Sequence, residues 1–154
     1  MTIIERKGNL ITLAQAGEFD VIVQGSNCFN TMGKGLALEM KKAFPECYEA
    51  DCNTIKGDKS KLGGVSIAES GDLIIVNAYT QYYYGNKPGH KAPVDYEAVR
   101  QCLRLVKANY GHKRIGLPRI GAGLAGGEWK VIHAIIEGIF GHECGEGTVT
   151  VVTL

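Results

Sequence analysis

Two glycine-rich loops, each lying between a short apolar run and a helix-forming stretch, constrain the fold of this chain most. The first loop follows the β-branched run at residues 19–23 and includes residues 33–35. The second follows the run at residues 114–117 and spans residues 121–127. Such runs are typical of buried strands, and ligands of open α/β sheets bind where these strands end. We therefore expect both loops at the rim of a parallel sheet.

The rest of the chain alternates between strand-like and helix-like segments. Expected strands are residues 2–6, 19–23, 64–68, 73–78, 114–117 and 148–153, with a hairpin turn at residues 70–72. Expected helices are residues 35–44, which Pro45 stops, then 46–55, 94–110 and 128–140. Residues 79–91 are polar and interrupted by glycine, which indicates a loop. This alternation predicts an α/β fold with a mainly parallel sheet and helices on both faces.

Composition limits the class of protein further. The 154 residues suit one domain, residues 1–154, and 17 Lys and Arg against 16 Asp and Glu give no strong nucleic-acid signal. No run of 18 apolar residues predicts a membrane span, and the charged N-terminus is unlike a signal peptide. Five cysteines without C-x-x-C spacing favour a reduced, cytoplasmic protein.

The chemistry of the two loops depends on their glycines. Of the 154 residues 21 are glycine, roughly twice the usual share of about 7%. Glycine at a helix start lets backbone N–H groups approach an anion, and the helix dipole favours negative charge there. Neither loop matches Walker A or G-x-G-x-x-G. The glycines either make tight turns only or form two backbone cradles, for two phosphates or for a phosphate and a ribose; the repeated strand–loop–helix pattern favours the cradles.

The chain resembles a macro domain, the module that binds ADP-ribose, from Thr2 to Leu154. The most specific segments are VQGSNCFNTMGKGLA at residues 23–37, PRIGAGLAGGEW at residues 118–129 and VTVVTL at residues 149–154. They look closest to the branch that includes ADP-ribose 1″-phosphate phosphatases and terminal ADP-ribose protein glycohydrolases. The resemblance implies a three-layer α/β/α sandwich around a mixed, mainly parallel sheet. It also implies ADP-ribose, its 1″-phosphate or ADP-ribosylated macromolecules as partners, and we expect no cofactor and no metal.

The resemblance assigns roles to matched positions. Asn9 lies where the family often has an aspartate that accepts from the adenine amino group, and Asn27 matches an asparagine beside the distal ribose. Residues 33–35 and 121–126 match the glycine loops, and the second loop wraps the diphosphate in the family. The implied ligand-binding residues are Gly8, Asn9, Leu10, Gln24, Gly25, Asn27, Met32, Gly33, Lys34, Gly35, Leu36, Thr80, Pro118, Arg119, Ile120, Gly121, Ala122, Gly123, Leu124, Ala125, Gly126 and Leu154.

Two positions depart from the glycohydrolase branch. Ala125 stands where that branch has a catalytic aspartate, and residues 79–81 stand where its catalytic lysine should fall. The lysine–aspartate mechanism of the branch is therefore not supported, and Lys87 or Lys91 would have to replace the lysine.

Phosphate-ester hydrolysis needs a proton-transfer group and donors for the developing charge. The candidate catalytic residues are Asn27, His90 and Asp95. Asp95 also suits the N-cap of the following helix, and His90 suits a solvated loop. We expect a hydrolase that removes the terminal phosphate of ADP-ribose 1″-phosphate. The alternatives are a non-catalytic reader of ADP-ribose and an enzyme that releases ADP-ribose from modified protein or nucleic acid.

Other reactive or aromatic side chains have two interpretations each. Cys28 in the first loop is either a reactive thiol or a packing residue. Tyr79, Tyr82, Tyr83 and Tyr84 either stack on a nucleobase or nucleic acid or pack over the ligand cleft. His142 and Cys144 have no second pair at zinc-site spacing, which argues against a metal.

Overall fold

The computed structural model describes residues 2–84, 94–123, 125–141 and 147–154. The strands in these ranges are β1 (Thr2–Lys7), β2 (Val21–Ser26), β3 (Val65–Ser70), β4 (Leu73–Tyr79), β5 (Arg114–Leu117) and β6 (Thr148–Thr153). The helices are α1 (Leu10–Gln15), α2 (Gly35–Ala43), α3 (Pro45–Cys52), α4 (Tyr96–Tyr110) and α5 (Trp129–Phe140), with a short 3₁₀ helix, η1, at Lys59–Lys61.

The strands form one six-stranded sheet in the order β1-β6-β5-β2-β4-β3. β3 and β4 run antiparallel, and the other neighbouring pairs run parallel. Ser70 pairs with Leu73 across the tight turn at Gly71 and Asp72, where Gly71 has a φ of +59° that favours glycine. The expected hairpin and the mixed, mainly parallel sheet are therefore confirmed.

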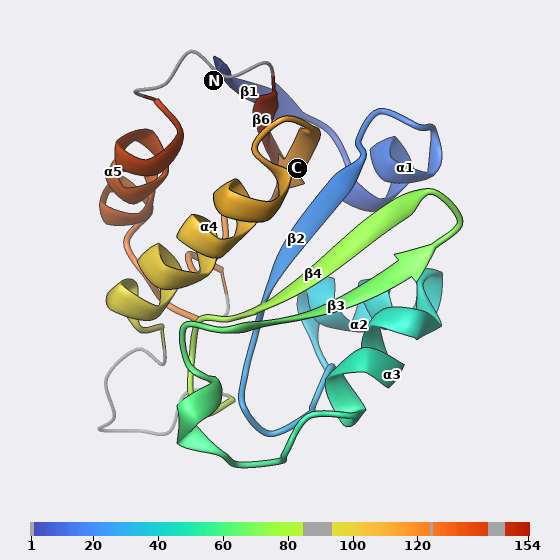
Figure 1. The fold of residues 1–154 in the computed structure, drawn as a ribbon, viewed down its shortest axis with the longest axis vertical. Coiled ribbons are helices and arrows are strands. Elements are labelled where there is room, and N and C mark those ends of the chain that lie inside the picture. Colours follow the sequence, from blue (N-terminus) through green and yellow to red (C-terminus); the bar gives the residue numbers. More distant parts are fainter. Residues whose placement is uncertain (1, 85–93, 124, 142–146) are drawn as a thin grey trace.

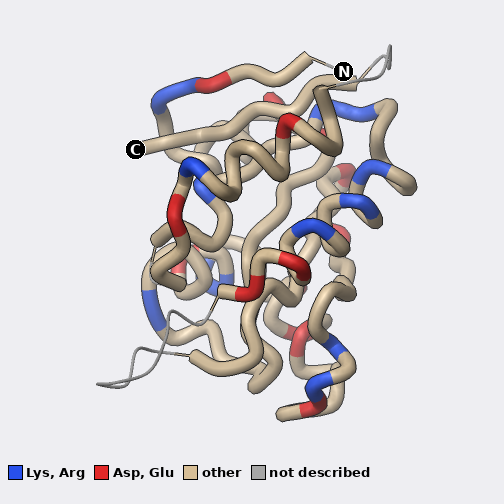
Figure 2. The backbone as a smooth tube through the Cα atoms, turned by 90° about the vertical axis from the view of Figure 1, so that its left-hand side faces the viewer, with Lys and Arg blue, Asp and Glu red and all other residues tan. Residues whose placement is uncertain are grey.

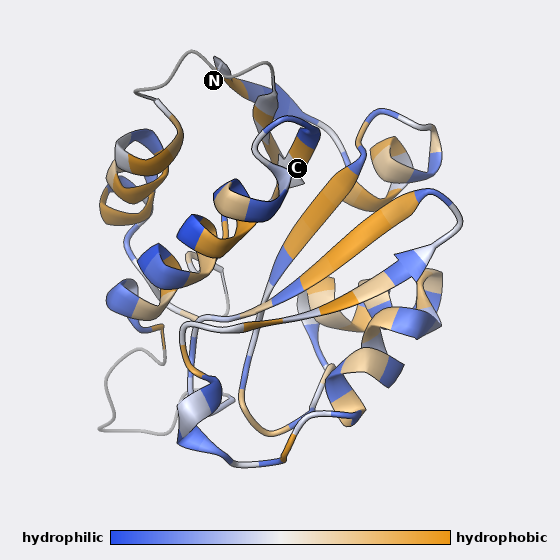
Figure 3. Ribbon diagram, viewed as in Figure 1, coloured by the Kyte–Doolittle hydropathy of each residue, from blue (hydrophilic) through white to orange (hydrophobic). Residues whose placement is uncertain are grey.

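Helices cover both faces of the sheet and produce three layers (Figure 1). Side chains alternate along β2, so Val21 and Val23 face the core under α4 and α5, whereas Ile22 faces the core under α1, α2 and α3. Figure 3 shows β2 and β4 as long apolar stretches between these layers. Burial on both faces explains why these strands read as nearly continuous apolar runs.

Charged residues of both signs are distributed over the whole chain. Figure 2 shows basic and acidic residues interspersed along the backbone. Within the described ranges no helix has the length and apolar character needed to cross a membrane.

Several elements differ from those expected; α3, for example, ends at Cys52 and not at residue 55, and three of the differences have a clear local cause. α1 was not expected because its six residues are too few to display a helical period. β2 continues through Ser26 because its last residues still pair with β4, Gln24 opposite Asn77 and Ser26 opposite Tyr79. α4 begins at Tyr96, two residues later than expected, because Asp95 is its N-cap.

Candidate functional site

The sheet has a switch point between β2 and β5. After β2 the chain passes through α2 and α3 to β3 and β4 on one side, whereas after β5 it passes through α5 to β6 on the other. The β2–β5 ladder consists of Val21 with Ile115 and Ile22 with Gly116, and no pair beyond Gly116 joins the described parts of these strands. Crevices of this kind, beyond the carboxyl ends of parallel strands, are the usual ligand sites of open α/β sheets.

The first loop, residues 27–34, leads into an uncapped helix start. Lys34 occupies the N-cap position of α2 without a side-chain hydrogen bond, and the first turn contains no acidic residue. Within the described residues, the N–H groups of Gly35, Leu36 and Ala37 have no acceptor. The start of α2 therefore presents backbone donors and the positive end of a helix dipole to an anion.

The second loop, residues 118–128, is a series of tight turns. Ile120 N–H donates to Pro118 O at 2.7 Å, Ala122 N–H to Arg119 O at 3.0 Å, and Gly127 N–H to Gly121 O at 2.8 Å. Gly121 and Gly126 have φ values of +77° and +72°, which explains glycine at both positions.

These turns leave several donors of the second loop unused. The N–H groups of Gly121, Gly123 and Ala125 donate to no acceptor in the described part of the chain. α5 follows this loop, and its N-cap residue Glu128 also makes no side-chain capping bond. The second loop therefore resembles the first in one respect. Each leads into a helix without a side-chain cap and leaves backbone N–H groups free to bind a ligand.

Gly25 lies where β2, the end of β4 and the second loop approach one another. A Cβ at this position would lie 2.9 Å from Thr80 Oγ1, which follows β4, and 3.4 Å from Ile120 Cγ1 in the second loop. The Oγ atoms of Ser26 and Thr80 and the Oε1 of Gln24 are buried without a hydrogen-bond partner in the described chain. Because an unpaired buried oxygen costs about 1–3 kcal/mol, these groups are suited to bind a water or a ligand atom.

Asn27 organises the first loop through its side chain. Its Nδ2 donates to Thr31 O at 3.1 Å and to Thr31 Oγ1 at 2.9 Å, and its Oδ1 accepts from Phe29 N–H at 2.8 Å. Asn27 is 9% exposed. The predicted ligand-binding asparagine thus lies at the β2–β4 end of the crevice and fixes the curvature of its own loop.

Lys61, a residue that sequence reasoning missed, anchors this loop from outside. Its Nζ donates to Cys28 O at 3.0 Å and to Asn30 Oδ1 at 2.8 Å, and it lies 4.9 Å from the centre of the Tyr79 ring. Gly57 N–H also donates to Cys28 O, at 2.7 Å. Asn30 has a positive φ of +55°, a costly conformation that these contacts hold in place. No local pattern could reveal this anchor, because it joins residues that are 31 or more positions apart.

The tyrosines that follow β4 pack against the first loop. Phe29 meets Tyr82 and Tyr83 edge to face, with ring centroids 5.0 and 5.2 Å apart, and Tyr83 stacks on Tyr84 at 4.6 Å. Tyr82 OH donates to Gly57 O at 2.9 Å. These contacts attach Tyr82 and Tyr83 to the first loop, while Tyr84 keeps 45% of its surface exposed.

The residues expected around adenine gather at the ends of β1 and β6. Gly8 N–H donates to Thr153 O at 2.8 Å, which brings Gly8 and Asn9 next to the exposed Leu154. Asn9 Oδ1 accepts from Thr12 N–H at 3.0 Å and so caps α1. The structure therefore gives Asn9 a capping role that the sequence did not suggest, and the second lone pair of its oxygen stays available.

Several expected ligand-binding side chains are buried. Leu10 and Met32 are 5% and 3% exposed and belong to the core under α1, α2 and α3. Ala125 is 8% exposed, and Arg119 places its guanidinium 5.1 Å from the centre of the Trp129 ring. Leu124, His90, Lys87 and Lys91 lie outside the described residues. Backbone rather than side-chain atoms therefore make up most of what these positions offer to a ligand.

Asp95, one of the two expected proton-transfer residues, is engaged as a helix cap. Asp95 Oδ1 accepts from Ala98 N–H at 3.0 Å, so the carboxylate caps α4, the simpler of its two interpretations. Its own N–H donates to Thr80 O at 2.8 Å, which ties the start of α4 to the end of β4. Among the described residues no group of three His, Cys, Asp or Glu side chains could hold a metal ion.

Three cysteine thiols among the described residues are buried, and one of them, Cys28, belongs to the first loop. Burial raises the pKa of the Cys28 thiol, whose Sγ donates to Gln81 O at 3.6 Å. Burial also raises the pKa of Cys47 to about 11 and that of Cys102 to about 12. All three thiols stay protonated at neutral pH, as packing residues do.

Asp51 is a buried carboxyl on α3. Tyr79 OH donates to its Oδ1 at 2.7 Å, and burial raises its pKa above the ordinary value. Tyr79 also contacts Ser66, with 2.8 Å between the hydroxyl oxygens, and Asn77 donates to Ser66 Oγ at 3.1 Å. This polar chain joins α3 to the β3–β4 hairpin beneath the Lys61 anchor.

Residues 23–136 match the macro domain family, and the chain belongs to this family. A 17.5 kDa protein in the tk–vs intergenic region of enterobacteria phage T4 is 36% identical, with 85% of each chain covered. A DNA ADP-ribosyl glycohydrolase of Thermus aquaticus is 27% identical over 85% of this chain but only 36% of its own length. An ADP-ribose 1″-phosphate phosphatase of Debaryomyces hansenii is 25% identical, with 84% of this chain and 89% of the relative covered.

Solved structures have the same fold. A Bacteroides thetaiotaomicron protein aligns with a TM-score of 0.76 at 27% identity, covering 98% of this chain and 99% of that one. Thermosipho africanus DarTG in complex with ADP-ribose aligns with a TM-score of 0.76 at 18% identity, covering all of this chain and 42% of that one. The three-layer α/β architecture expected from the sequence is confirmed.

Proposed function

We propose that this macro domain binds ADP-ribose along the carboxyl edge of its sheet, with the diphosphate between the two loops. The observation that carries the proposal is the pair of unused donor sets at the β2–β5 switch point. One set belongs to Gly35, Leu36 and Ala37 at the uncapped start of α2. The other belongs to the second loop. Backbone donors can bind a diphosphate without a cluster of cations, which fits the net charge of +1.

The strand order supports one direction for the ligand. Adenine would lie at the β1–β6 end beside Asn9 and Leu154, and the distal ribose would lie at the β2–β4 end beside Asn27. The diphosphate would then span β5 and β2 in the middle. A relative named ADP-ribose 1″-phosphate phosphatase and a similar fold solved with ADP-ribose support this choice of ligand.

We further propose hydrolysis of ADP-ribose 1″-phosphate. Water attacks the terminal phosphorus, the bond between phosphorus and the ribose oxygen breaks, that oxygen takes a proton, and ADP-ribose and inorganic phosphate leave. Backbone N–H groups of the first loop would hold the phosphate oxygens, and the Thr80 hydroxyl would hold a water or a ribose oxygen. His90 stays the predicted proton-transfer residue, because Asp95 is engaged as a helix cap.

Two measurements separate the steps of this proposal. Calorimetry with ADP-ribose is expected to show binding, and absence of heat at about 1 mM ligand would contradict it. Phosphate release from ADP-ribose 1″-phosphate is expected to exceed the buffer rate. Binding without release would make the protein a reader of ADP-ribose.

A second candidate function is release of ADP-ribose from nucleic acid. Tyr84 favours it, because this ring is 45% exposed and stacks on Tyr83 beside the first loop. Exposed aromatic rings stack with unpaired bases at about 1–3 kcal/mol per base. The test is release of ADP-ribose from a modified single-stranded oligonucleotide, with Tyr84→Ala expected to slow that release but not hydrolysis of the free 1″-phosphate.

A further inference from the structure

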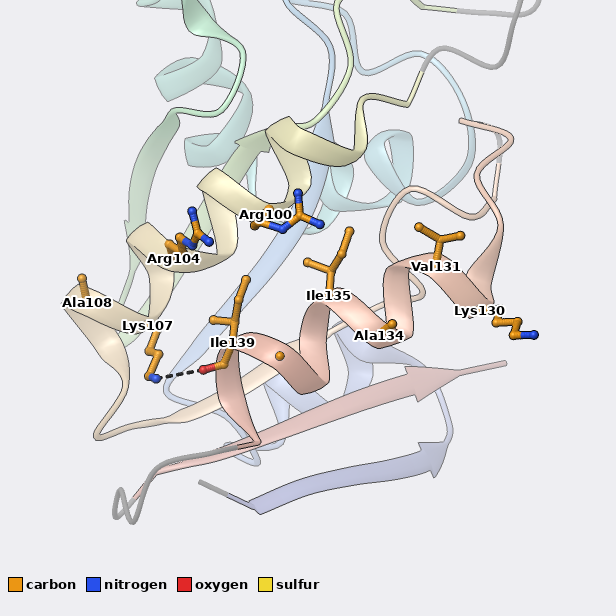
Figure 4. Close-up of a pocket in the computed structure, with 10 residues that line it drawn as sticks. Arg100, Arg104, Lys107, Ala108, Lys130, Val131, Ala134, Ile135 and Ile139 are labelled. Atoms are coloured by element: carbon orange, nitrogen blue, oxygen red, sulfur yellow. Dashed lines mark hydrogen bonds between the residues drawn. The ribbon is translucent and has the colours of Figure 1, made fainter.

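A groove lies between α4 and α5 on the side of these helices away from the sheet (Figure 4). Its volume is about 990 Å³. Val131, Ile135 and Ile139 recur every four residues along α5 and line the groove, and Gly138 and Ala134 leave space between them. The core-facing residues of α4, such as Val99 and Leu103, belong to its other face. Ile135 is buried in the core at 6% exposure, and Val131 and Ile139 are partly buried against it, so the floor of the groove is the apolar outer edge of the core.

The rims of the groove are basic. Arg100, Arg104 and Lys107 of α4 and Lys130 of α5 line it, and none of its lining residues is acidic. Arg100 pairs with Glu97, and Lys107 Nζ donates to Ile139 O at 2.8 Å.

Two of these basic side chains form no ion pair within the described residues. Arg104 and Lys130 have no acidic partner among the residues that the structure describes. Glu137 of α5 and Glu5 of β1 lie instead beside His133, each 3.6 Å from its Nε2. Positive charge is therefore concentrated along the groove although the whole chain is nearly neutral.

We propose that this groove binds a short amphipathic helix with acidic flanks, supplied by a partner protein. α5 has 12 residues, which corresponds to a length of about 18 Å and matches a partner helix of about three turns. The apolar face of that helix would cover Val131, Ala134 and Ile139, and its carboxylates would meet Arg104 and Lys130. A nucleic-acid backbone would pair with the cations but leave the apolar floor of the groove uncovered, so the combination favours the helix.

The test uses the whole chain and a synthetic probe. The probe is a peptide of about 14 residues with leucines on one helical face and glutamates beside them, and its control is the same composition in scrambled order. Amide NMR is expected to show shifts within residues 100–108 and 130–139. Arg104→Glu/Lys130→Glu is expected to weaken binding at least about tenfold. The matched charge change Lys42→Glu/Lys56→Glu, at exposed lysines elsewhere, is expected to leave it within about twofold.

Several outcomes would overturn the proposal: equal binding of the scrambled peptide, no shifts at about 1 mM probe, or binding indifferent to the charge reversal. Self-association of the chain that buries these residues, seen by sedimentation, would also overturn it. Ala134→Glu is a second variant at an exposed position of the groove, in case the double variant unfolds, and is expected to reduce binding as well. No groove residue belongs to the two loops, so ADP-ribose affinity is expected to be unchanged in all these variants.

Discussion

Gly25 is the residue at which β2, the end of β4 and the second loop come closest together. Gly25→Ala would place a Cβ 2.9 Å from Thr80 Oγ1 and 3.4 Å from Ile120 Cγ1. Overpacking of this kind typically costs about 1–3 kcal/mol, so we expect a lower free energy of unfolding and weaker ADP-ribose binding. Thermal unfolding and calorimetry measure the two effects.

Two further variants serve as controls for Gly25→Ala. Adding Thr80→Ala removes the clashing hydroxyl and is expected to restore part of the lost stability. Gly138→Ala, where nothing lies within 4 Å of the new Cβ, is expected to raise stability by roughly 0.5–1 kcal/mol because it lies inside a helix. An unchanged unfolding temperature for Gly25→Ala would show that Thr80 and Ile120 can move aside to admit the new Cβ, and would contradict the expectation.

Asn27 supports the site by holding its own loop. Asn27→Ala removes the hydrogen bonds to Thr31 and Phe29, each worth roughly 0.5–1.5 kcal/mol. We expect ADP-ribose affinity to fall about tenfold, and turnover to fall further if Asn27 also positions water. Asn53→Ala, at the exposed end of α3, is the control. An Asn27→Ala variant with unaltered affinity would mean that the loop is held without this side chain.

At the scale of elements, Lys61 connects η1 to the first loop. Lys61→Met keeps most of the side-chain length but removes the donors to Cys28 O and Asn30 Oδ1. We expect ADP-ribose affinity to fall about fivefold or more, while Lys61→Arg retains part of it and Lys56→Met, at an exposed lysine, changes nothing. If Lys61→Met binds as well as the original chain, the anchor does not shape the binding loop.

The attachment of α3 to the sheet gives a pH dependence with a defined sign. Burial raises the pKa of Asp51 in the folded protein, so the folded state binds this proton more tightly than the unfolded chain does. The contribution of Asp51 to stability is therefore greatest at acid pH and is lost as pH rises through its raised pKa. The free energy of unfolding of Asp51→Asn, taken relative to that of the original chain, is therefore expected to be higher at about pH 7 than at about pH 4. Urea unfolding at a series of pH values measures this effect.

In the same experiment Asp20 is expected to show the opposite pH dependence of stability. A side-chain hydrogen bond from Arg114 lowers the pKa of Asp20, so its contribution is present above the unfolded pKa and is lost as pH falls. Asp20→Asn should therefore lose more stability near neutral pH than at acid pH. The same trend in both variants would contradict this assignment of the two carboxyls.

The sequence predicts elements well where a long pattern defines them and poorly where a short contact does. The 15 residues of α4 and the apolar strands have clear periods, whereas α1 has six residues and depends on its Asn9 cap. Asp95 shows why the sequence alone leaves two roles open, because aspartate suits both a helix cap and a catalytic site. The hydrogen bond from Ala98 N–H, which only the structure shows, identifies it as a cap. Lys61 could not be predicted, because side chains distant in sequence meet only after folding.

At the scale of the whole molecule, the topology explains why the two glycine-rich loops could be placed at one edge of the sheet without a structure. β2 and β5 are parallel neighbours, so the loops that follow them lie at the same edge, and the chain leaves the two strands in opposite directions. The sequence could not show which N–H groups remain unused, because that depends on how each loop bonds to itself. It also gave no sign of the groove between α4 and α5, whose lining residues come from two distant helices.

The most direct test of the account is an amide NMR titration of the chain with ADP-ribose. The account predicts saturable shifts at the donors of both loops, namely Gly35, Leu36, Ala37, Gly121, Gly123 and Ala125, with smaller shifts near Gly8 and Asn9. Stabilisation against heat should accompany them, since a ligand that binds only the folded state raises the unfolding temperature. Absence of shifts at these amides at about 1 mM ADP-ribose, or shifts confined to another part of the molecule, would contradict it.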